Sequence, residues 1–301
     1  MTAEIYITTV TPFNNQMKVD TQRIKKIVEY LIENGIKHII PLGTTGEFST
    51  LTLMEKKEMI SATISAAGNA EVIPNISSTS FKESIELCKY YKDWGLSTVL
   101  LLPPYYFKSK GEGFKKFIEE ITSLCDVKIW IYNNPLQTGI ELSAEDMLTL
   151  SKSNAIIGFK DASPQLLELR KFVMMRDKSK KILGGLEEYG FYSLLLGSDG
   201  FTSSIGNFIP QLPLNICNRF NEGNLVEANR LNTILVDYRT YMLESNQPVM
   251  MHFAKIGLKK IGLIENTIVR PPLSNISEEQ NKKIEKFIDQ IFKQLPEFQK
   301  R

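Results

Sequence analysis

Short apolar runs rich in β-branched residues recur over the first 205 residues of the chain, and helical patterns separate them. The runs follow one another at intervals of roughly 30 residues, which is the length of a strand–helix–strand unit. They are nearly continuous rather than alternating, as in strands that are buried on both faces. The eight runs cover residues 5–10, 38–43, 70–76, 97–104, 127–133, 155–160, 180–185 and 199–205.

The segments between the runs carry the periodicity and the end signals of helices. Residues 20–35 place aliphatic side chains on one face. Thr52 with Glu55, and Ser80 with Glu83, have the spacing of capping boxes. Alternating strands and helices predict an α/β fold, either a (β/α)8 TIM barrel or an open doubly wound sheet. Eight regular units without a G-x-G-x-x-G motif favour the barrel.

The strand pattern stops after residue 222, and only helical patterns follow. We therefore predict a (β/α)8 barrel catalytic domain over residues 1–222 and a C-terminal helical domain over residues 223–301. The predicted helices of this extension cover residues 223–243, 249–261 and 277–295.

Composition excludes several classes of function. The formal net charge of the 301 residues is +2, so no strong field favours nucleic acid or an acidic membrane. Three scattered cysteines, Cys88, Cys125 and Cys217, predict neither a disulfide framework nor a zinc site. We find no signal peptide and no apolar stretch near the roughly 20 residues of a membrane span, so a cytoplasmic protein is expected.

Lys160 ends the sixth apolar run, in the stretch AIIGFKDAS. In such barrels the active site lies at the carboxyl ends of the strands, so Lys160 is expected at the functional mouth. An amine in an apolar pocket tends to be neutral, and a neutral amine can attack a ketone to form a Schiff base. The alternative is a structural lysine that buries its stem or pairs with Asp161.

Two further strand ends carry candidate chemistry. The turn GTTGE at residues 43–47 combines glycines with hydroxyl residues, so its backbone N–H groups can converge on an anion such as a carboxylate. The alternative is an ordinary tight turn. Tyr132 ends the fifth run and can transfer a proton, or it is a structural tyrosine of the barrel.

Taken together, the motifs GTTGE, PPYY (103–106), YNNP (132–135), GFKD (158–161) and RPPL (270–273) resemble the dihydrodipicolinate synthase / N-acetylneuraminate lyase family. The resemblance covers essentially the whole chain in order and spacing. It implies a (β/α)8 barrel with a C-terminal helical domain, assembled as a homotetramer that is a dimer of dimers. It also implies a class I aldolase that uses pyruvate without a metal or an organic cofactor.

The resemblance also implies roles for single residues. Lys160 is the expected Schiff-base lysine, and Tyr132 is the expected proton-transfer group near the pyruvyl moiety. Thr44 and Thr45 are expected to bind the pyruvate carboxylate, with Thr45 also in the proton relay. Tyr106 is expected to reach the neighbouring site across a dimer interface, with the adjacent Tyr105 as an alternative register. Gly185 and Thr202 are expected to line the pyruvate pocket.

Departures from the family pattern concern the second substrate. Gln137 stands where typical dihydrodipicolinate synthases have an arginine that binds the carboxylate of aspartate semialdehyde. Glu187 and Glu188 match an Asp–Glu pair that accepts hydrogen bonds from sugar hydroxyls in sialic-acid lyases, and Ser204 matches a serine that contacts the polyol. The alternative for the two glutamates is a favourable charge in the first turn of a helix.

These residues predict an aldolase acting on a 2-keto-3-deoxy sugar acid, with 2-keto-3-deoxygluconate as the best candidate substrate. Cleavage would give pyruvate and glyceraldehyde. The alternatives are dihydrodipicolinate synthase, N-acetylneuraminate lyase and a non-catalytic sensor on the same barrel. The expected partners are small molecules and copies of the same chain, with no nucleic acid and no membrane.

Overall fold

The computed structural model describes residues 2–244 and 250–296 of the chain. The eight strands are β1 (Glu4–Thr8), β2 (His38–Ile40), β3 (Glu71–Val72), β4 (Thr98–Leu101), β5 (Lys128–Asn133), β6 (Ile156–Asp161), β7 (Lys181–Gly184) and β8 (Gly200–Ser203). They form one sheet in the order β3-β2-β1-β8-β7-β6-β5-β4. An isolated parallel bridge between Asn75, just after β3, and Leu100 in β4 closes this order.

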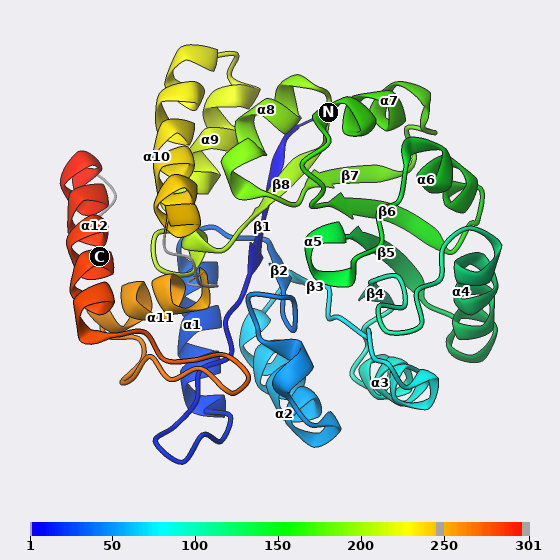
Figure 1. Cartoon of the computed structure of the whole chain (residues 1–301), viewed down its shortest axis with the longest axis horizontal. Helices are drawn as coiled ribbons and strands as arrows, with labels where there is room; N and C mark the ends of the chain where they lie inside the picture. Colours follow the sequence, from blue (N-terminus) through cyan, green and yellow to red (C-terminus); the bar gives the residue numbers. More distant parts are fainter. Residues whose placement is uncertain (1, 245–249, 297–301) are drawn as a thin grey trace. The chain divides into compact units, whose positions relative to one another are not determined.

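This strand order identifies the fold as a (β/α)8 TIM barrel, as predicted, because β1 neighbours both β2 and β8 and the Asn75–Leu100 bridge joins the two ends of the order. The principal helices follow the strands and then fill the C-terminal part of the chain (Figure 1). They are α1 (Thr21–Glu33), α2 (Leu53–Ala67), α3 (Phe81–Asp93), α4 (Glu112–Cys125), α5 (Pro135–Thr138), α6 (Ala144–Ser151), α7 (Leu166–Met175), α8 (Gly190–Leu195), α9 (Gln211–Asn221), α10 (Leu225–Glu244), α11 (Met250–Lys260) and α12 (Glu278–Gln294). None of the helices within the described ranges is long and apolar enough to cross a membrane.

The predicted helix starts are confirmed in position, but one cap differs. Thr52 and Glu55 form a complete capping box at the start of α2. At the start of α3 the Ser80 hydroxyl accepts from the Glu83 N–H, while the Glu83 carboxylate accepts from the hydroxyl of Ser78. The Ser78 hydroxyl in turn accepts from the Ser80 N–H at 3.0 Å, so it stands between the two groups that a complete capping box would join directly.

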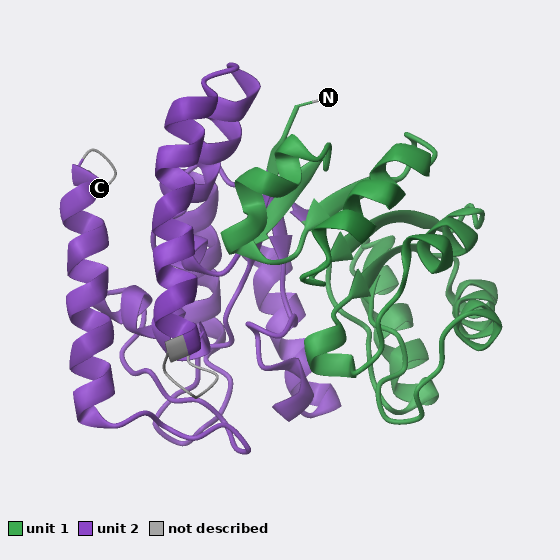
Figure 2. Cartoon of the chain, turned by 45° about the horizontal axis from the view of Figure 1, so that its top comes forward, with its two compact units in different colours: residues 1–4, 72–202 green, residues 5–71, 203–301 purple. Residues whose placement is uncertain are grey.

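The chain separates into two compact units, shown in Figure 2. Unit 1 comprises residues 1–4 and 72–202, and in it α3, α4, α6 and α7 lie outside strands β4–β7 (Figure 1). Unit 2 comprises residues 5–71 and 203–301. The boundary between a barrel and a helical domain at residue 222 stays a prediction.

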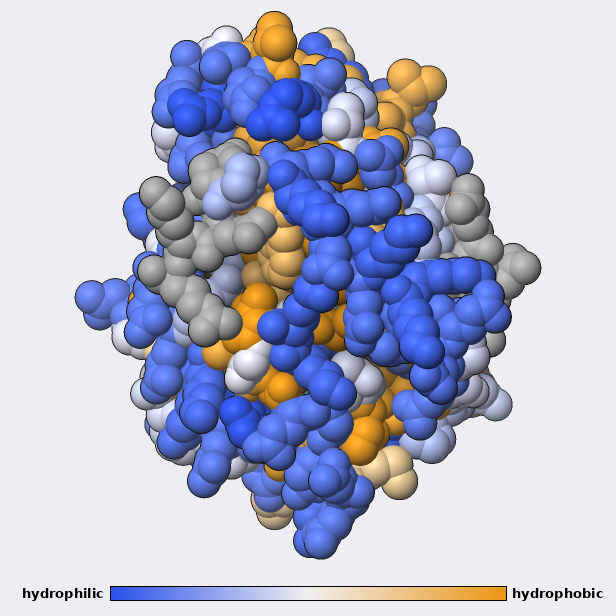
Figure 3. All heavy atoms as spheres, turned by 90° about the vertical axis from the view of Figure 1, so that its left-hand side faces the viewer, coloured by the Kyte–Doolittle hydropathy of each residue, from blue (hydrophilic) through white to orange (hydrophobic). Residues whose placement is uncertain are grey.

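The last helix, α12, has one charged and one buried face. Ile284, Ile288 and Ile291 are buried, at the spacing of one helical face. On the other face, charges four residues apart pair, as between Lys282 and Glu278 at 2.8 Å. Figure 3 shows this side of unit 2. Most side chains on it are hydrophilic, and apolar side chains are visible between them.

Candidate active site

The ends of β5 and β6 bring Tyr132 and Lys160 together. The two residues are direct partners in the parallel ladder, so their side chains leave the same face of the sheet. The Lys160 amine lies 4.1 Å from the centroid of the Tyr132 ring. Both residues are almost fully buried, with exposed fractions of 3% and 4%. The predicted nucleophile and the predicted proton-transfer group are thus neighbours in a site largely closed to water.

One layer deeper, a large and a small residue fill the space below this pair. Trp130 is the ladder partner of Gly158, two residues before Tyr132 and Lys160 respectively. A Cβ on Gly158 would lie 2.5 Å from the Trp130 ring, so no larger residue fits there. The glycine of the GFKD motif therefore admits the indole that supports the base of the site.

Asp161 is held on the opposite face of β6 from Lys160. Its carboxylate accepts from the Asn133 amide at 2.8 Å, and from the backbone N–H and hydroxyl of Ser163 at 3.2 and 3.4 Å. Burial raises its pKa from 3.8 to about 6, although these hydrogen bonds oppose the shift. The structural alternative in which Asp161 serves as the partner of Lys160 is not favoured, since adjacent residues of a strand point to opposite faces.

The raised pKa of Asp161 predicts a loss of stability as the pH rises from 3.8 to about 6. In that window the folded chain retains a proton that the unfolded chain has released, so the free energy of unfolding falls by up to about 3 kcal/mol. Asp161→Asn should remove this dependence. Urea unfolding of both proteins at pH 4 and pH 7 measures it, and equal pH dependence in the two proteins would contradict the assignment.

Gly185 and Thr202, predicted to line the pyruvate pocket, meet beside β6. The Gly185 N–H donates to the Asp161 carbonyl at 2.6 Å, and the Thr202 hydroxyl donates to the Gly185 carbonyl at 3.4 Å. A Cβ on Gly185 would lie 2.7 Å from the Ala162 nitrogen. The close approach of two backbones thus explains the second glycine of GGLEE.

The residues predicted to select the second substrate lie on short helices. Gln137 is exposed within α5, directly after the end of β5. Glu187 and Glu188 lie in the 3-10 turn Glu187–Tyr189 and are buried, with exposed fractions of 7% and 8%. Both side chains are therefore not the solvated charges of an exposed first turn, and their contact with substrate hydroxyl groups stays a prediction.

In unit 2, the GTTGE turn follows β2. The N–H of Gly46 donates to the Gly43 carbonyl at 3.0 Å and closes the turn. Thr45 is buried, and its hydroxyl lies 3.1 Å from that of Thr8, which donates to the Ser203 carbonyl at 3.1 Å. A chain of hydroxyl groups therefore fixes the Thr45 side chain, and this contact with Thr8 was not predicted from the sequence.

The last residue of the motif, Glu47, anchors the turn to distant parts of unit 2. It is buried in a left-handed backbone conformation, with φ of 54°. Its carboxylate accepts from the Lys255 amine of α11 at 2.5 Å and from the Arg270 N–H at 2.9 Å. Burial lowers the pKa of Lys255, and the Glu47 carboxylate opposes that shift. The guanidinium of Arg270 binds both carboxylate oxygens of Glu55, at 2.6 and 2.7 Å.

Ser204 and Tyr106, two further predicted site residues, each contact an aromatic side chain. The buried Ser204 hydroxyl lies 3.1 Å from the Tyr238 hydroxyl of α10, and its contact with a polyol stays a prediction. Tyr106 is 77% exposed and packs edge-to-face against Phe107 at 5.2 Å. Tyr105 is half-buried, and burial raises the pKa of its phenol.

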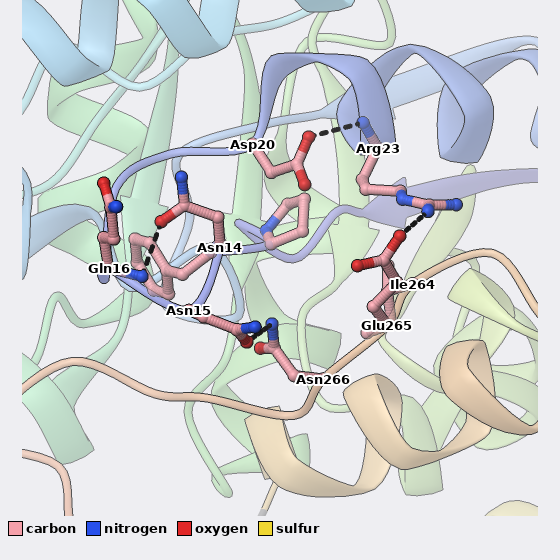
Figure 4. Close-up of a pocket in the computed structure, with 10 residues that line it drawn as sticks. Asn14, Asn15, Gln16, Asp20, Arg23, Ile264, Glu265 and Asn266 are labelled. Atoms are coloured by element: carbon pink, nitrogen blue, oxygen red, sulfur yellow. Dashed lines mark hydrogen bonds and ion pairs between the residues drawn. The ribbon is translucent and has the colours of Figure 1, made fainter.

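A polar hollow of about 260 Å³ lies on unit 2 but includes none of the predicted site residues (Figure 4). It is formed by the loop after β1 and a segment near residue 265. Arg23 and Glu265 form an ion pair at one side, and the Asn266 amide donates to Asn15 at 3.2 Å. Its polar groups thus partner one another.

Comparison with known proteins identifies the family and agrees with the fold. The model of the dihydrodipicolinate synthetase family matches residues 1–291. A 4-hydroxy-tetrahydrodipicolinate synthase of Methanothrix thermoacetophila is 29% identical over 277 residues, which cover 91% of this chain and 92% of the relative.

Solved structures give the same fold. YagE, a prophage protein of E. coli K12 from the dihydrodipicolinic acid synthase family that was crystallised with pyruvate, superimposes with a TM-score of 0.90 at 24% identity, over 96% of this chain and 98% of YagE. A sialic acid aldolase of Ruminococcus gnavus gives a TM-score of 0.92 at 19% identity, over 98% and 97% of the two chains. The chain therefore belongs to the dihydrodipicolinate synthetase family and is a pyruvate-dependent lyase of the Schiff-base-forming class.

Proposed function

We propose that the protein cleaves a 2-keto-3-deoxy sugar acid, with 2-keto-3-deoxygluconate as the best candidate, into pyruvate and glyceraldehyde. The observation that carries this choice is the uncharged Gln137 in YNNPLQTG, at the position of the arginine that binds the second carboxylate in typical dihydrodipicolinate synthases. An amide cannot replace a guanidinium as a bidentate, charged partner. A neutral aldehyde such as glyceraldehyde needs no such partner.

In the proposed reaction, the Lys160 amine attacks the C2 carbonyl of the substrate and expels water to form an iminium ion. Tyr132, together with Thr45, takes the proton of the C4 hydroxyl as the C3–C4 bond breaks. The electron pair of that bond passes into the iminium and gives an enamine, and glyceraldehyde leaves. Protonation of the enamine at C3 and hydrolysis of the iminium then release pyruvate and the free lysine. The burial of Lys160 beside Tyr132 supports these roles.

The remaining predicted residues would recognise the two ends of the substrate. Thr44 and Thr45 are assigned to the carboxylate, and Gly185 with Thr202 to the walls of the pyruvate pocket. Glu187, Glu188 and Ser204 are assigned to the hydroxyl groups, because each hydroxyl hydrogen needs an acceptor. The exposed Tyr106 is assigned to the site of a neighbouring subunit in a homotetramer.

A second candidate is the condensation of pyruvate with aspartate semialdehyde, since the relative from Methanothrix thermoacetophila is named as a 4-hydroxy-tetrahydrodipicolinate synthase. Cleavage of N-acetylneuraminate is the third, given the sialic acid aldolase fold match. A non-catalytic sensor is disfavoured because Lys160, Tyr132 and both threonines of GTTGE are all present.

The deciding experiment is pyruvate release from 2-keto-3-deoxygluconate, followed through lactate dehydrogenase. Rapid release supports the proposal. If the protein is covalently modified by pyruvate and borohydride but releases no pyruvate from 2-keto-3-deoxygluconate, the Schiff-base chemistry is supported and this substrate is excluded. Aspartate semialdehyde and N-acetylmannosamine, each with pyruvate, would then be tested in that order.

The role of Gln137 predicts the effect of restoring the arginine. Gln137→Arg should raise kcat/KM for aspartate semialdehyde by about tenfold. This corresponds to the low end of the free energy of one charge-assisted hydrogen bond, because the side chain at position 137 is exposed to water. Leu136→Arg is the matched control, since it adds the same charge to the adjacent exposed position. An equal gain in both variants would show a general charge effect, and no gain in Gln137→Arg would refute the role of this position.

A further inference from the structure

Asn134, the second asparagine of the YNNP motif, has an unusual hydrogen-bond partner. Asn134 is the residue before Pro135, at the start of α5, where an asparagine side chain commonly accepts from the backbone of the first helical turn. Its side chain makes no such bond. The amide instead donates to the Tyr132 hydroxyl oxygen at 2.9 Å, and the residue is buried, with an exposed fraction of 5%.

The backbone carbonyl of Asn134 is anchored by three hydrogen bonds at the start of α5. It accepts from the N–H groups of Gln137 and Thr138 at 3.1 and 3.0 Å. The buried Thr138 hydroxyl adds a third bond to the same carbonyl at 2.9 Å. These contacts hold the backbone from which the side-chain amide projects toward Tyr132.

An N–H that donates to a phenol oxygen has two consequences for the phenol. It occupies one side of the oxygen, so the Tyr132 hydrogen is directed to the other side. It also stabilises the negative charge that grows on this oxygen whenever the proton departs, since hydrogen bonds to charged acceptors are roughly twice as strong as neutral ones. The Lys160 amine lies 4.1 Å from the centroid of the Tyr132 ring, on the side chain that the Asn134 amide contacts at its hydroxyl.

We propose that Asn134 is a positioning residue that directs the hydroxyl proton of Tyr132 and stabilises its oxygen during proton transfer. This inference rests on the proposed function, because it takes Tyr132 as the proton-transfer group. It does not depend on which aldehyde the enzyme releases. In this role Asn134 acts through Tyr132 and not on the substrate directly.

The test follows exchange of the methyl hydrogens of pyruvate with deuterium oxide by NMR. This exchange needs the enamine and a proton-transfer group but no aldehyde. Asn134→Leu, which keeps the shape and removes the donor, should slow exchange by about tenfold to a hundredfold. The fraction of chains that pyruvate and borohydride modify at saturation should stay close to that of the wild type. Asn134→Asp, which keeps the shape but presents a carboxylate, should not restore exchange.

A double variant separates action through Tyr132 from a general disturbance of the site. Once Tyr132→Phe has removed the hydroxyl, adding Asn134→Leu should cause no further loss of exchange. Full additivity of the two losses, or wild-type exchange in Asn134→Leu, would overturn the inference. Absence of pyruvate release from a keto sugar acid by a wild type that still exchanges would overturn the proposed substrate alone, so the two failures are distinguishable.

Discussion

Lys160→Ala should reduce turnover by at least about 10³-fold and abolish covalent modification by pyruvate and borohydride. The buried amine is the atom that forms the bond to C2, and neither water nor Tyr132 can replace it. Mass spectrometry of the trapped protein reads the covalent step directly, and pyruvate release reads turnover. Because both readouts depend on one nitrogen atom, they should be lost together.

Lys128→Ala is the matched control for this variant. Lys128 starts β5, the strand that carries Tyr132, and its exposed side chain donates to the Asn154 carbonyl at 3.2 Å. Its removal should leave turnover close to that of the wild type. Near-normal activity of Lys160→Ala, in protein whose thermal unfolding is preserved, would disprove the Schiff-base assignment at this position.

Lys255→Met should cost about 3–5 kcal/mol of the free energy of unfolding. The side chains of Lys255 and Glu47 are 1% and 0% exposed, so the substitution leaves a buried carboxylate without its charged partner. Methionine replaces the lysine stem at similar volume, and the loss therefore reports the charge rather than a cavity. Urea unfolding at pH 7 measures it.

Two further variants show whether the loss belongs to the pair. Lys259→Met alters an exposed lysine of the same helix and should change stability by no more than about 0.5 kcal/mol. Replacing both partners, as in Lys255→Met with Glu47→Gln, should recover part of the loss, because no unpaired charge is left inside. A double variant less stable than Lys255→Met would contradict this account.

The sequence predicts the strand–helix order well because apolar periodicity reflects burial, which is what shapes the barrel. It predicts the strand ends less well. The run 70–76 is mostly apolar and residues 72–76 are buried, yet β3 is only Glu71–Val72, with one isolated bridge further on at Asn75. Burial continues past the point where the backbone leaves the ladder, so composition alone cannot place the last hydrogen bond.

For the candidate site, the residues at strand ends were predictable and the contacts that orient them were not. Lys160 and Tyr132 follow from the rule that barrel sites lie at the carboxyl ends of strands. The donation from Asn134 to Tyr132 depends on the backbone at the start of α5 and on the side-chain torsions of Asn134, which residue type does not reveal. Lys255 gave no local signal, since an amphipathic helix usually exposes its lysines.

The bonds of Glu47 also bear on the order in which the protein is made. Its partners Lys255 and Arg270 follow it by 208 and 223 positions. On the ribosome, a chain that has already produced GTTGE, YNNP and GFKD still holds a glutamate with neither partner. We expect nascent chains stalled before residue 255 to lack a native GTTGE turn although every residue of the motif is present. Premature stop codons between the GFKD motif and residue 255 should therefore inactivate the enzyme as completely as loss of Lys160.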